Sequence, residues 1–255
     1  MVTMPSRNAR AQAERASRLL DRLLLQYERR LAAEIRRAML QAWRLYSTGS
    51  DTWLAVTMAD HEARSRRLLE ALWRSSAAVG ERVAPVGKAR HDVEVKADVP
   101  DTPAATEAIA RYIRLYSGDK ITQITQTTLD DVQRVISQGI EAGLTERELA
   151  SQIRAYAVTK SLSRAQTIAR TETHQASSFV TDEMVKASGI EFEREWVASK
   201  GERTRRAHRD ADGQRRGMTE PFSVGGELLM YPGDPDGSAH NVINCRCQIA
   251  YLPKR

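Results

Sequence analysis

The stretch that decides the fold is Ile190-Glu191-Phe192-Glu193-Arg194-Glu195-Trp196-Val197, in which apolar and charged residues alternate. A period of two is typical of a half-buried β-strand, and here it follows a long region with helical spacing. Further along, residues 221–231 predict a hairpin that turns at Gly225-Gly226, and residues 245–252 predict a last strand. We therefore expect a mainly α-helical chain with a small C-terminal α+β module of antiparallel strands.

The region before this switch begins with one long helix, predicted over residues 6–47 with Ser6 as its N-cap. Its apolar residues recur every three or four positions and form one stripe. The stripe includes Leu20, Leu24, Tyr27, Leu31 and Ile35. Thr48-Gly49-Ser50 ends this helix, and a second helix is expected to run to about Val83. The two helices are predicted to pack as a long antiparallel hairpin.

The middle of the chain is also predicted to be helical. Residues 84–103 contain four prolines and glycines in a polar stretch, which indicates a linker that could hold one short strand. Helices are expected from Ala104, with a break at Gly118, and a capping box at residues 145–148 should start another helix. A last helix is predicted from about Ser161 or Ser163 to Gly189. The predicted domains are therefore 1–84, a basic helical hairpin; 85–103, a linker; 104–160, a helical middle segment; and 161–255, the C-terminal module.

Charge is distributed unevenly along the 255 residues, whose formal net charge is +6. Residues 1–90 contain 17 Lys and Arg against 9 Asp and Glu, a net charge of +8, and the remainder is close to neutral. Such asymmetry indicates contact with a polyanion or an acidic protein surface, although a solvated helix face would give the same pattern. The residues expected to contact DNA are Arg15, Arg18, Arg22, Arg29, Arg36 and Arg37.

Composition excludes several classes of protein. With 41% hydrophobic and 28% charged residues, the chain can build a core and is not compositionally disordered. Its two cysteines cannot form a disulfide framework. No apolar run approaches the ~20 residues of a membrane-spanning helix, and no apolar stretch of the signal-peptide type follows Met1, so we expect a soluble protein without a membrane partner.

Reactive side chains concentrate near the C-terminus, where His208, His240, Cys245 and Cys247 could together hold a structural zinc ion. On a regular strand the two cysteines would point to opposite faces, so both could bind one metal only if the chain bends near Asn244. The alternative is that the cysteines are simply buried side chains in a small core. We expect no firm cofactor beyond this possible zinc.

Catalytic motifs are not found in the sequence. It has no nucleophile elbow, no Walker loop and no His-Glu-x-x-His motif. Glu172 and His174 are two positions apart on a predicted helix and should not face each other. We therefore expect a protein that is not an enzyme, with a metal- or cysteine-dependent hydrolase as a disfavoured alternative.

Six separated elements nevertheless occur in an order that resembles the phage Mu F-like family, the head-morphogenesis domain of minor capsid proteins in tailed phages. The resemblance covers roughly residues 145–255. The elements are Ile168-Ala169-Arg170-Thr171-Glu172-Thr173, Trp196, Arg203-Thr204-Arg205-Arg206-Ala207-His208, Asp212-Gly213-Gln214 with Phe222, Pro232-Gly233-Asp234-Pro235, and Asn244-Cys245-Arg246-Cys247.

The resemblance implies a minor head protein with a structural role, inside the capsid near the portal and made in the host cytoplasm. Its implied partners are the portal protein, the major capsid or scaffold protein, and packaged double-stranded DNA, which it would help to package or deliver. We expect the apolar stripe to contact the portal or a neighbouring head protein, because it exceeds what a lone hairpin can bury. Acting mainly on the packaged genome as a non-specific DNA-binding protein is the alternative.

The motif residues are expected to hold loops together. Gly213 suits a turn with positive φ, Asp234 suits an Asx-type turn, and the arginines would bind carboxylates or backbone carbonyls. The structural set is Arg170, Glu172, Trp196, Arg205, Asp212, Gly213, Asp234, Asn244 and Arg246. The family commonly has an aspartate shortly before the Arg203 segment, where this chain has Lys200-Gly201-Glu202, so Glu202 or Asp210 would have to order that loop.

Overall fold

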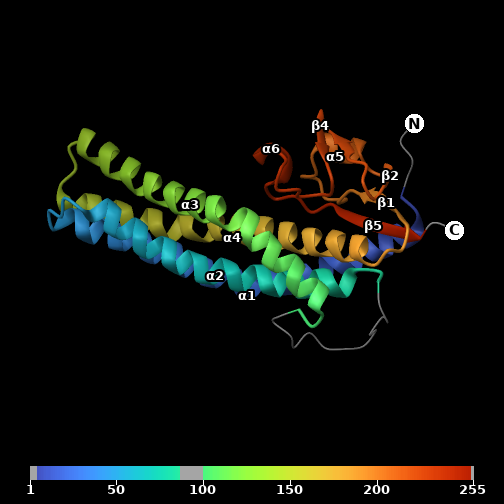
Figure 1. Cartoon of the computed structure of the whole chain (residues 1–255). Coiled ribbons are helices and arrows are strands. Elements are labelled where there is room, and N and C mark those ends of the chain that lie inside the picture. The colour runs from blue at the N-terminus through green and yellow to red at the C-terminus, as the bar shows by residue number, and fades with distance from the viewer. Residues whose placement is uncertain (1–4, 87–99, 254–255) are drawn as a thin grey trace. The chain divides into compact units, whose positions relative to one another are not determined.

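The computed structural model describes residues 5–86 and 100–253, and most of its elements are labelled in Figure 1. It confirms the expected fold class, since four long helices precede short strands near the C-terminus. The long helices are α1 (Arg7–Ser47), α2 (Trp53–Val83), α3 (Pro103–Glu141) and α4 (Glu146–Ala187). The strands and short helices that follow are β1 (Phe192–Val197), α5 (Arg206–Asp210), β2 (Arg215–Gly217), β3 (Phe222–Val224), β4 (Glu227–Leu229), α6 (Ala239–Val242) and β5 (Gln248–Pro253).

The chain packs into two compact units, and each long helix contributes to both. The first unit comprises Met1–Leu24, Ala71–Arg114 and Arg170–Arg255, and the second comprises Leu25–Glu70 and Leu115–Ala169. This division follows packing, so the predicted segments 1–84, 104–160 and 161–255 each supply residues to both units. Most of the predicted linker, including its short strand, lies outside the described residues.

The second unit is built from helices alone. Its buried apolar side chains recur at helical spacing, as in Tyr27, Leu31 and Ile35 of α1. A buried polar cluster lies in the same unit, where the Glu34 carboxylate accepts hydrogen bonds from Arg37 at 2.7 Å and contacts Nδ1 of His61 at 3.1 Å. Charges held inside a protein need such partners, because desolvation disfavours an isolated ion.

The first unit combines helix ends with all of the described strands. β1 is the central strand of an antiparallel sheet in the order β2-β1-β5, and β3 pairs with β4. One face of this sheet packs on helices, because Ala9 and Ala13 of α1 contact Val197 and Ala250, while Val185 of α4 packs with Phe192 and Tyr251. In Figure 1 the strands accordingly lie beside the C-terminal part of α4.

Local signals at the element ends are confirmed. The Ser6 hydroxyl accepts a hydrogen bond from the Ala9 amide at the start of α1. At the start of α4, Thr145 and Glu148 form the reciprocal capping box. The β3–β4 hairpin turns at Gly225 and Gly226 with φ of 60° and 87°, the positive values that a two-residue type I′ turn requires.

Two predicted helix breaks are wrong. α3 continues through Gly118, since a glycine inside a helix costs only about 1 kcal/mol relative to alanine and packing on either side outweighs that cost. α4 likewise continues through Ser161 and Ser163, whose hydroxyls bond the carbonyls of Val158 and Lys160. Serine is compatible with a helix interior when its hydroxyl bonds back to the preceding turn.

None of the helices in the described parts of the chain combines the length and the apolar character needed to span a bilayer.

Candidate functional site

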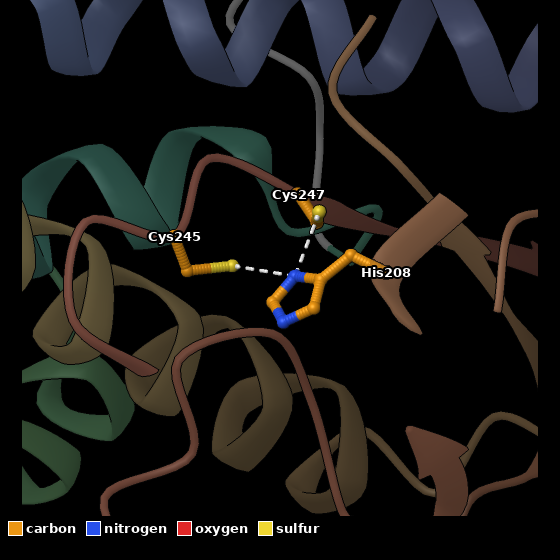
Figure 2. A group of neighbouring side chains, drawn as sticks. All are labelled: His208, Cys245 and Cys247. Atoms are coloured by element: carbon orange, nitrogen blue, oxygen red, sulfur yellow. Dashed lines mark hydrogen bonds between the residues drawn. The ribbon is translucent and has the colours of Figure 1, made fainter. Parts of the chain in front are cut away.

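Three of the four predicted metal-ligating side chains meet in the first unit. Nδ1 of His208 lies 3.4 Å from Sγ of Cys247 and 3.6 Å from Sγ of Cys245. Figure 2 shows the imidazole ring with this nitrogen directed at both sulfurs. All three side chains are buried, and their candidate ligand atoms lie within 4.8 Å of one another. The fourth predicted ligand, His240, is exposed and stays outside the cluster, which corrects that part of the prediction.

The two cysteines share the cluster because they precede the last strand. β5 begins at Gln248, three residues later than the predicted start at Cys245. Asn244 has a φ of 58°, a left-handed conformation that turns the chain just before the cysteines. Alternation along a regular strand therefore does not apply, and both sulfurs can reach the His208 ring.

The orientation of the His208 ring is set by Asn241. Nε2 of His208 lies 3.3 Å from Oδ1 of Asn241, while Nδ2 of Asn241 donates to the carbonyl of Val224 at 3.2 Å. Because the amide nitrogen is used on Val224, the amide oxygen must face the ring and accept from Nε2–H. Nδ1 then carries the free lone pair, and this nitrogen faces the two sulfurs.

The pKa of the Cys245 thiol, which lies next to the turn at Asn244, is shifted by its neighbours. A hydrogen bond from Cys247 lowers the pKa of the Cys245 thiol, and burial opposes this effect only in part. The positive charge of Arg205 acts in the same direction as the hydrogen bond. The hydrogen bond with Cys245 and burial instead raise the pKa of the Cys247 thiol. Of the two thiols, Cys245 is therefore the one favoured as a thiolate, the form that binds metals and acts as a nucleophile.

His174 stands behind the cluster, and sequence reasoning assigned it no role. Its Nε2 lies 2.6 Å from the carbonyl oxygen of Cys247, to which it donates. Burial lowers the pKa of His174 to about 4, so the ring is neutral at pH 7. A Cβ placed on Gly233 would lie only 2.6 Å from Nδ1 of His174, so the glycine makes room for this ring. Its neighbour Glu172 instead accepts a hydrogen bond from Nε1 of Trp73 at 3.0 Å, consistent with the two side chains facing apart.

A cavity of about 570 Å³ opens beside the cluster. Its lining includes His208, Cys245 and Cys247 together with Arg203, Arg205 and Arg246. The arginines make this cavity a place where water or a small anion could approach the sulfurs.

The turn at Asn244 is fixed by three of the motif residues. Nη1 of Arg170 donates to Oδ1 of Asn244 at 3.0 Å, and the Asn244 amide donates to Oγ1 of Thr171 at 3.1 Å. Nη2 of Arg205 donates to the carbonyl of Ile243 at 2.6 Å. The expected loop-tying role is thus seen for Arg170 and Arg205, whereas Arg246 is exposed on the cavity wall.

A second set of hydrogen bonds, made by Asp212, connects the start of α1 to the strands. Its carboxylate accepts from Arg10 at 2.5 Å and from the Ala198 amide at 2.7 Å. Gly213, with a φ of 78°, then places its amide 2.8 Å from the carbonyl of Trp196. The expected positive-φ turn at Gly213 is therefore present, and it holds the buried Trp196 strand in place.

Asp234 forms the expected Asx-type turn. Its two carboxylate oxygens accept hydrogen bonds from the amides of Met230, at 2.8 Å, and Asp236, at 3.1 Å. Burial raises the pKa of Asp234, and these two bonds offset part of that rise. The residue closes the loop that brings Gly233 against His174.

The loop before Arg203 is not ordered by an acidic residue. Thr204 closes it, with its hydroxyl bonded to the Ser199 carbonyl at 2.8 Å and its amide to the Gly201 carbonyl at 2.9 Å. Glu202 is exposed, and Asp210 only approaches the exposed Arg206 at 3.7 Å. The expectation that Glu202 or Asp210 takes the place of the family's aspartate is therefore wrong.

A buried arginine, Arg194, is the main structural residue that sequence reasoning missed. It is fully buried and donates to the carbonyls of Gly217, Glu220 and Met230. Its Nη1 also lies 3.5 Å from Asp182, which accepts a hydrogen bond from the Tyr251 hydroxyl. The signal was available, because period two places Arg194 on the same face of β1 as Phe192 and Trp196.

Of the two surfaces predicted on α1, the apolar stripe for a partner is buried, whereas most of the arginines for DNA are exposed. The structure buries the stripe of Leu20, Leu24, Tyr27, Leu31 and Ile35, so these residues belong to the core and offer no exposed surface to a partner. The stripe was expected to exceed what a lone hairpin can bury, but α1 packs in both units and its apolar side chains are covered there. Most of the arginines, namely Arg15, Arg18, Arg22, Arg29 and Arg36, are exposed, whereas Arg37 is bonded to Glu34 and Asp60.

Comparison with known proteins identifies the region that contains this site. Residues 130–250 match the family model described as phage Mu protein F like protein, as the motif order indicated. The minor head protein GP7 of Bacillus phage SPP1 is 28% identical over 158 residues, which are 60% of this chain and 51% of that protein. The NAD(+)–arginine ADP-ribosyltransferase EFV of Enterococcus faecalis is 28% identical over 137 residues, or 51% of this chain and 28% of that protein.

A shorter match is the uncharacterized protein YqbB of Bacillus subtilis, 35% identical over 91 residues, or 34% of this chain and 30% of that protein. The chain thus spans about half, or less, of the length of these relatives. No solved structure matches the chain.

Proposed function

We propose, from the phage Mu protein F-like domain that residues 130–250 form, that this chain is a minor head protein of a tailed phage and acts in head morphogenesis. The observation that carries the proposal is this family match, and the similarity to the minor head protein of Bacillus phage SPP1 supports it. Virion location follows from the same proposal, inside the head and near the portal vertex.

A structural role, rather than catalysis, is supported by how the motif residues are used. Asp212 is bonded to Arg10 and to the Ala198 amide, and Asp234 caps the turn after β4. Glu172 is bonded to Trp73 inside the first unit. A catalytic carboxylate must be within reach of a substrate, whereas these three hold the fold together. The transferase activity in the name of the Enterococcus faecalis relative belongs to that protein, of which the match covers 28%.

The experiment that tests the role is an early stop codon in the gene for this chain within a phage genome that carries it. We expect infected cells to accumulate aberrant or empty heads in electron micrographs, and the full chain supplied from a plasmid should restore infectious particles. Normal yields of infectious phage without the chain would contradict the proposal.

We propose the portal protein as the partner, contacted through apolar side chains on the second unit. With the α1 stripe buried, apolar surface is offered there by Leu25, Leu40, Val56, Leu115, Ile140, Val158 and Leu162, all exposed. Val158 and Leu162 are four positions apart on α4 and lie on one side of that helix. A contact with a partner protein through this pair would remove their apolar surface from water.

Changing Val158→Asp together with Leu162→Asp should prevent the chain from co-purifying with the portal protein, since two charges would be placed in an apolar contact. The matched control is Leu228→Asp, because Leu228 is 71% exposed in strand β4 of the first unit. Portal binding that survives the double change, or is lost equally in the control, argues against this surface.

The second candidate is contact with packaged DNA, and the exposed arginines of α1 favour it. α1 contains ten arginines and four acidic residues, a net charge of +6, and most of those arginines are exposed. Binding through phosphates should be independent of sequence and should weaken steeply with salt, by about 0.9 in log–log slope for each phosphate contact. Gel-shift titration of the full chain at two salt concentrations measures this slope, and a slope near zero would exclude electrostatic binding.

A further inference from the structure

We propose that His208, Cys245 and Cys247 together bind one Zn²⁺ ion, with the fourth coordination position of the metal directed into the adjoining cavity. The site joins α5 to the segment between Asn244 and β5. The proposal does not depend on the role of the chain in a phage head.

The distances among the three side chains fit a tetrahedral metal. Zinc bonds to sulfur at about 2.3 Å and to imidazole nitrogen at about 2.0 Å, and tetrahedral angles then place the nitrogen about 3.5 Å from each sulfur. The structure has these separations at 3.4 Å and 3.6 Å, measured from Nδ1 of His208 to Cys247 and Cys245. All three candidate ligand atoms lie within 4.8 Å of one another, so adjustment of the side chains can bring them around one Zn²⁺ ion.

The ring is held in the state that a metal needs. A metal-bound histidine commonly donates its second ring nitrogen to a fixed acceptor, which selects the tautomer and orients the ring. Asn241 supplies that acceptor, and its own amide is anchored on the Val224 carbonyl. Trp196 also packs against the ring in a T-shaped arrangement, with centroids 5.7 Å apart. The ligand geometry is thus set before a metal binds.

Charge balance also favours a divalent ion at this place. Both cysteine side chains are buried, and a buried thiolate without a positive partner is costly. Two thiolates and a neutral imidazole around Zn²⁺ have no net charge, so the complex suits an interior location. Sulfur ligands select zinc over magnesium or calcium, which prefer oxygen.

The fourth position is assigned to a molecule from the cavity. His240 is exposed and outside the cluster, so it is not the fourth ligand. The cavity borders all three ligands and is lined by Arg203, Arg205 and Arg246, which would favour water or a small anion there. Three protein ligands with one exchangeable position are found in zinc sites that are accessible to solvent molecules.

Metal binding would stabilise the C-terminal module. Its apolar core gathers around Trp196, Phe222 and the two cysteines, and is small. The ligands come from segments 37 and 39 residues apart in sequence, so a metal would close a long loop and thereby limit the unfolded state.

Zinc content of the full chain, purified under reducing conditions without chelator, is the direct test. We expect about one zinc per chain in the wild type and less than about a tenth of that in His208→Ala and in Cys247→Ser, since each loses one of three protein ligands. His240→Ala is the matched control and should keep its zinc. EDTA should lower the Tm of the wild type by about 5 °C or more, and added Zn²⁺ should restore it.

A second measurement covers the case in which the ligand variants do not fold. Co²⁺ added to the chelator-treated wild-type chain should produce near-ultraviolet thiolate-to-metal absorption and visible bands of tetrahedral cobalt, and Zn²⁺ should displace both. The proposal is overturned by a zinc content below about a tenth of an equivalent with a Tm unchanged in EDTA. It is also overturned by a Cys245–Cys247 disulfide under reducing conditions, by loss of zinc in His240→Ala, or by the absence of thiolate absorption with Co²⁺.

Discussion

Single buried charges in this chain depend on their hydrogen-bond partners. Burial alone would raise the pKa of Glu34, but hydrogen bonds from His61 and Arg37 outweigh it and hold the pKa below its usual value of 4.5. A carboxyl whose pKa is lowered by folding stabilises the folded state above its unfolded pKa and loses that contribution as the pH falls through the folded value. The second unit should therefore lose stability in acid through this residue.

Glu34→Gln should lower the free energy of unfolding by about 1–3 kcal/mol at neutral pH, since the buried His61 and the partly exposed Arg37 lose a charged partner. The difference from wild type should begin to shrink as the pH falls below 4.5, the pKa of the unfolded carboxyl, and should vanish as the pH falls through the lower pKa of the folded carboxyl. Urea unfolding over this pH range measures it. Glu62→Gln is the control, because Glu62 pairs with Arg66 where both side chains are well exposed, and a similar loss in that variant would contradict the account.

Arg194 provides the second test at this scale. Lysine keeps the charge but cannot reproduce the planar fork that bonds the carbonyls of Gly217, Glu220 and Met230. Arg194→Lys should therefore destabilise the chain by about 2 kcal/mol or more, through carbonyls left buried without donors. Arg206→Lys, at a side chain that is 90% exposed, should leave the Tm within error. Equal melting of the two variants would show that the buried network contributes little.

At the scale of elements, the continuity of the long helices is decided by packing rather than by local residue type. Gly118 is exposed within α3, and a Cβ there would meet no atom within 4 Å. Gly80 is also helical, but a Cβ there would lie 2.6 Å from the Ser177 carbonyl oxygen of α4. Glycine is therefore replaceable by a larger residue at position 118, whereas at position 80 the close approach of two helices requires it.

Gly118→Ala should raise the free energy of unfolding by about 0.5–1 kcal/mol, because alanine has the higher helix propensity and meets no obstacle. Gly80→Ala should lower it by at least about 1 kcal/mol, because the methyl group would push two packed helices apart. Thermal melting of both variants checks the pair. A destabilised Gly118→Ala would indicate that α3 is interrupted there after all.

Signals that act over a few residues could be read from the sequence alone. The strand β1, the capping box at Thr145 and the Gly225-Gly226 turn depend on neighbours in the chain, and the structure has all three. The predicted half-burial of this strand is wrong, because five of its six residues are buried. The predicted helix start near Ser161 is wrong because the Ser161 hydroxyl bonds to a carbonyl of the same helix. Whether a serine caps a helix or lies inside one depends on packing.

The candidate site was predictable only in part, for the same reason. Cysteine and histidine chemistry pointed to His208, Cys245 and Cys247, but the sequence could not exclude His240, because exposure is a property of the folded loop. Asn241 and His174 contact the cluster from positions that no local pattern marks. The left-handed turn at Asn244 lets both cysteine side chains reach the same histidine. From the sequence, a bend at this position was possible but could not be predicted.

At the scale of the whole molecule, the burial of the α1 stripe means that other side chains of the helices would have to contact a partner. Residues such as Leu31 and Ile35 form the chain's own core, while exposed apolar residues such as Val158 and exposed arginines such as Arg22 remain available. The residues that match the phage Mu protein F like family model include exposed apolar side chains such as Val158, whereas the exposed arginines of α1 lie outside that match.

The central claim is that this chain is a component of the phage head. Quantitative mass spectrometry of DNA-filled heads, purified from cells producing a phage that encodes the chain, tests it most directly. We predict that the chain is present in each preparation, at far fewer copies than the major capsid protein and in constant ratio to the portal protein. Heads that lack the chain, although it is expressed in the same infected cells, would contradict the account.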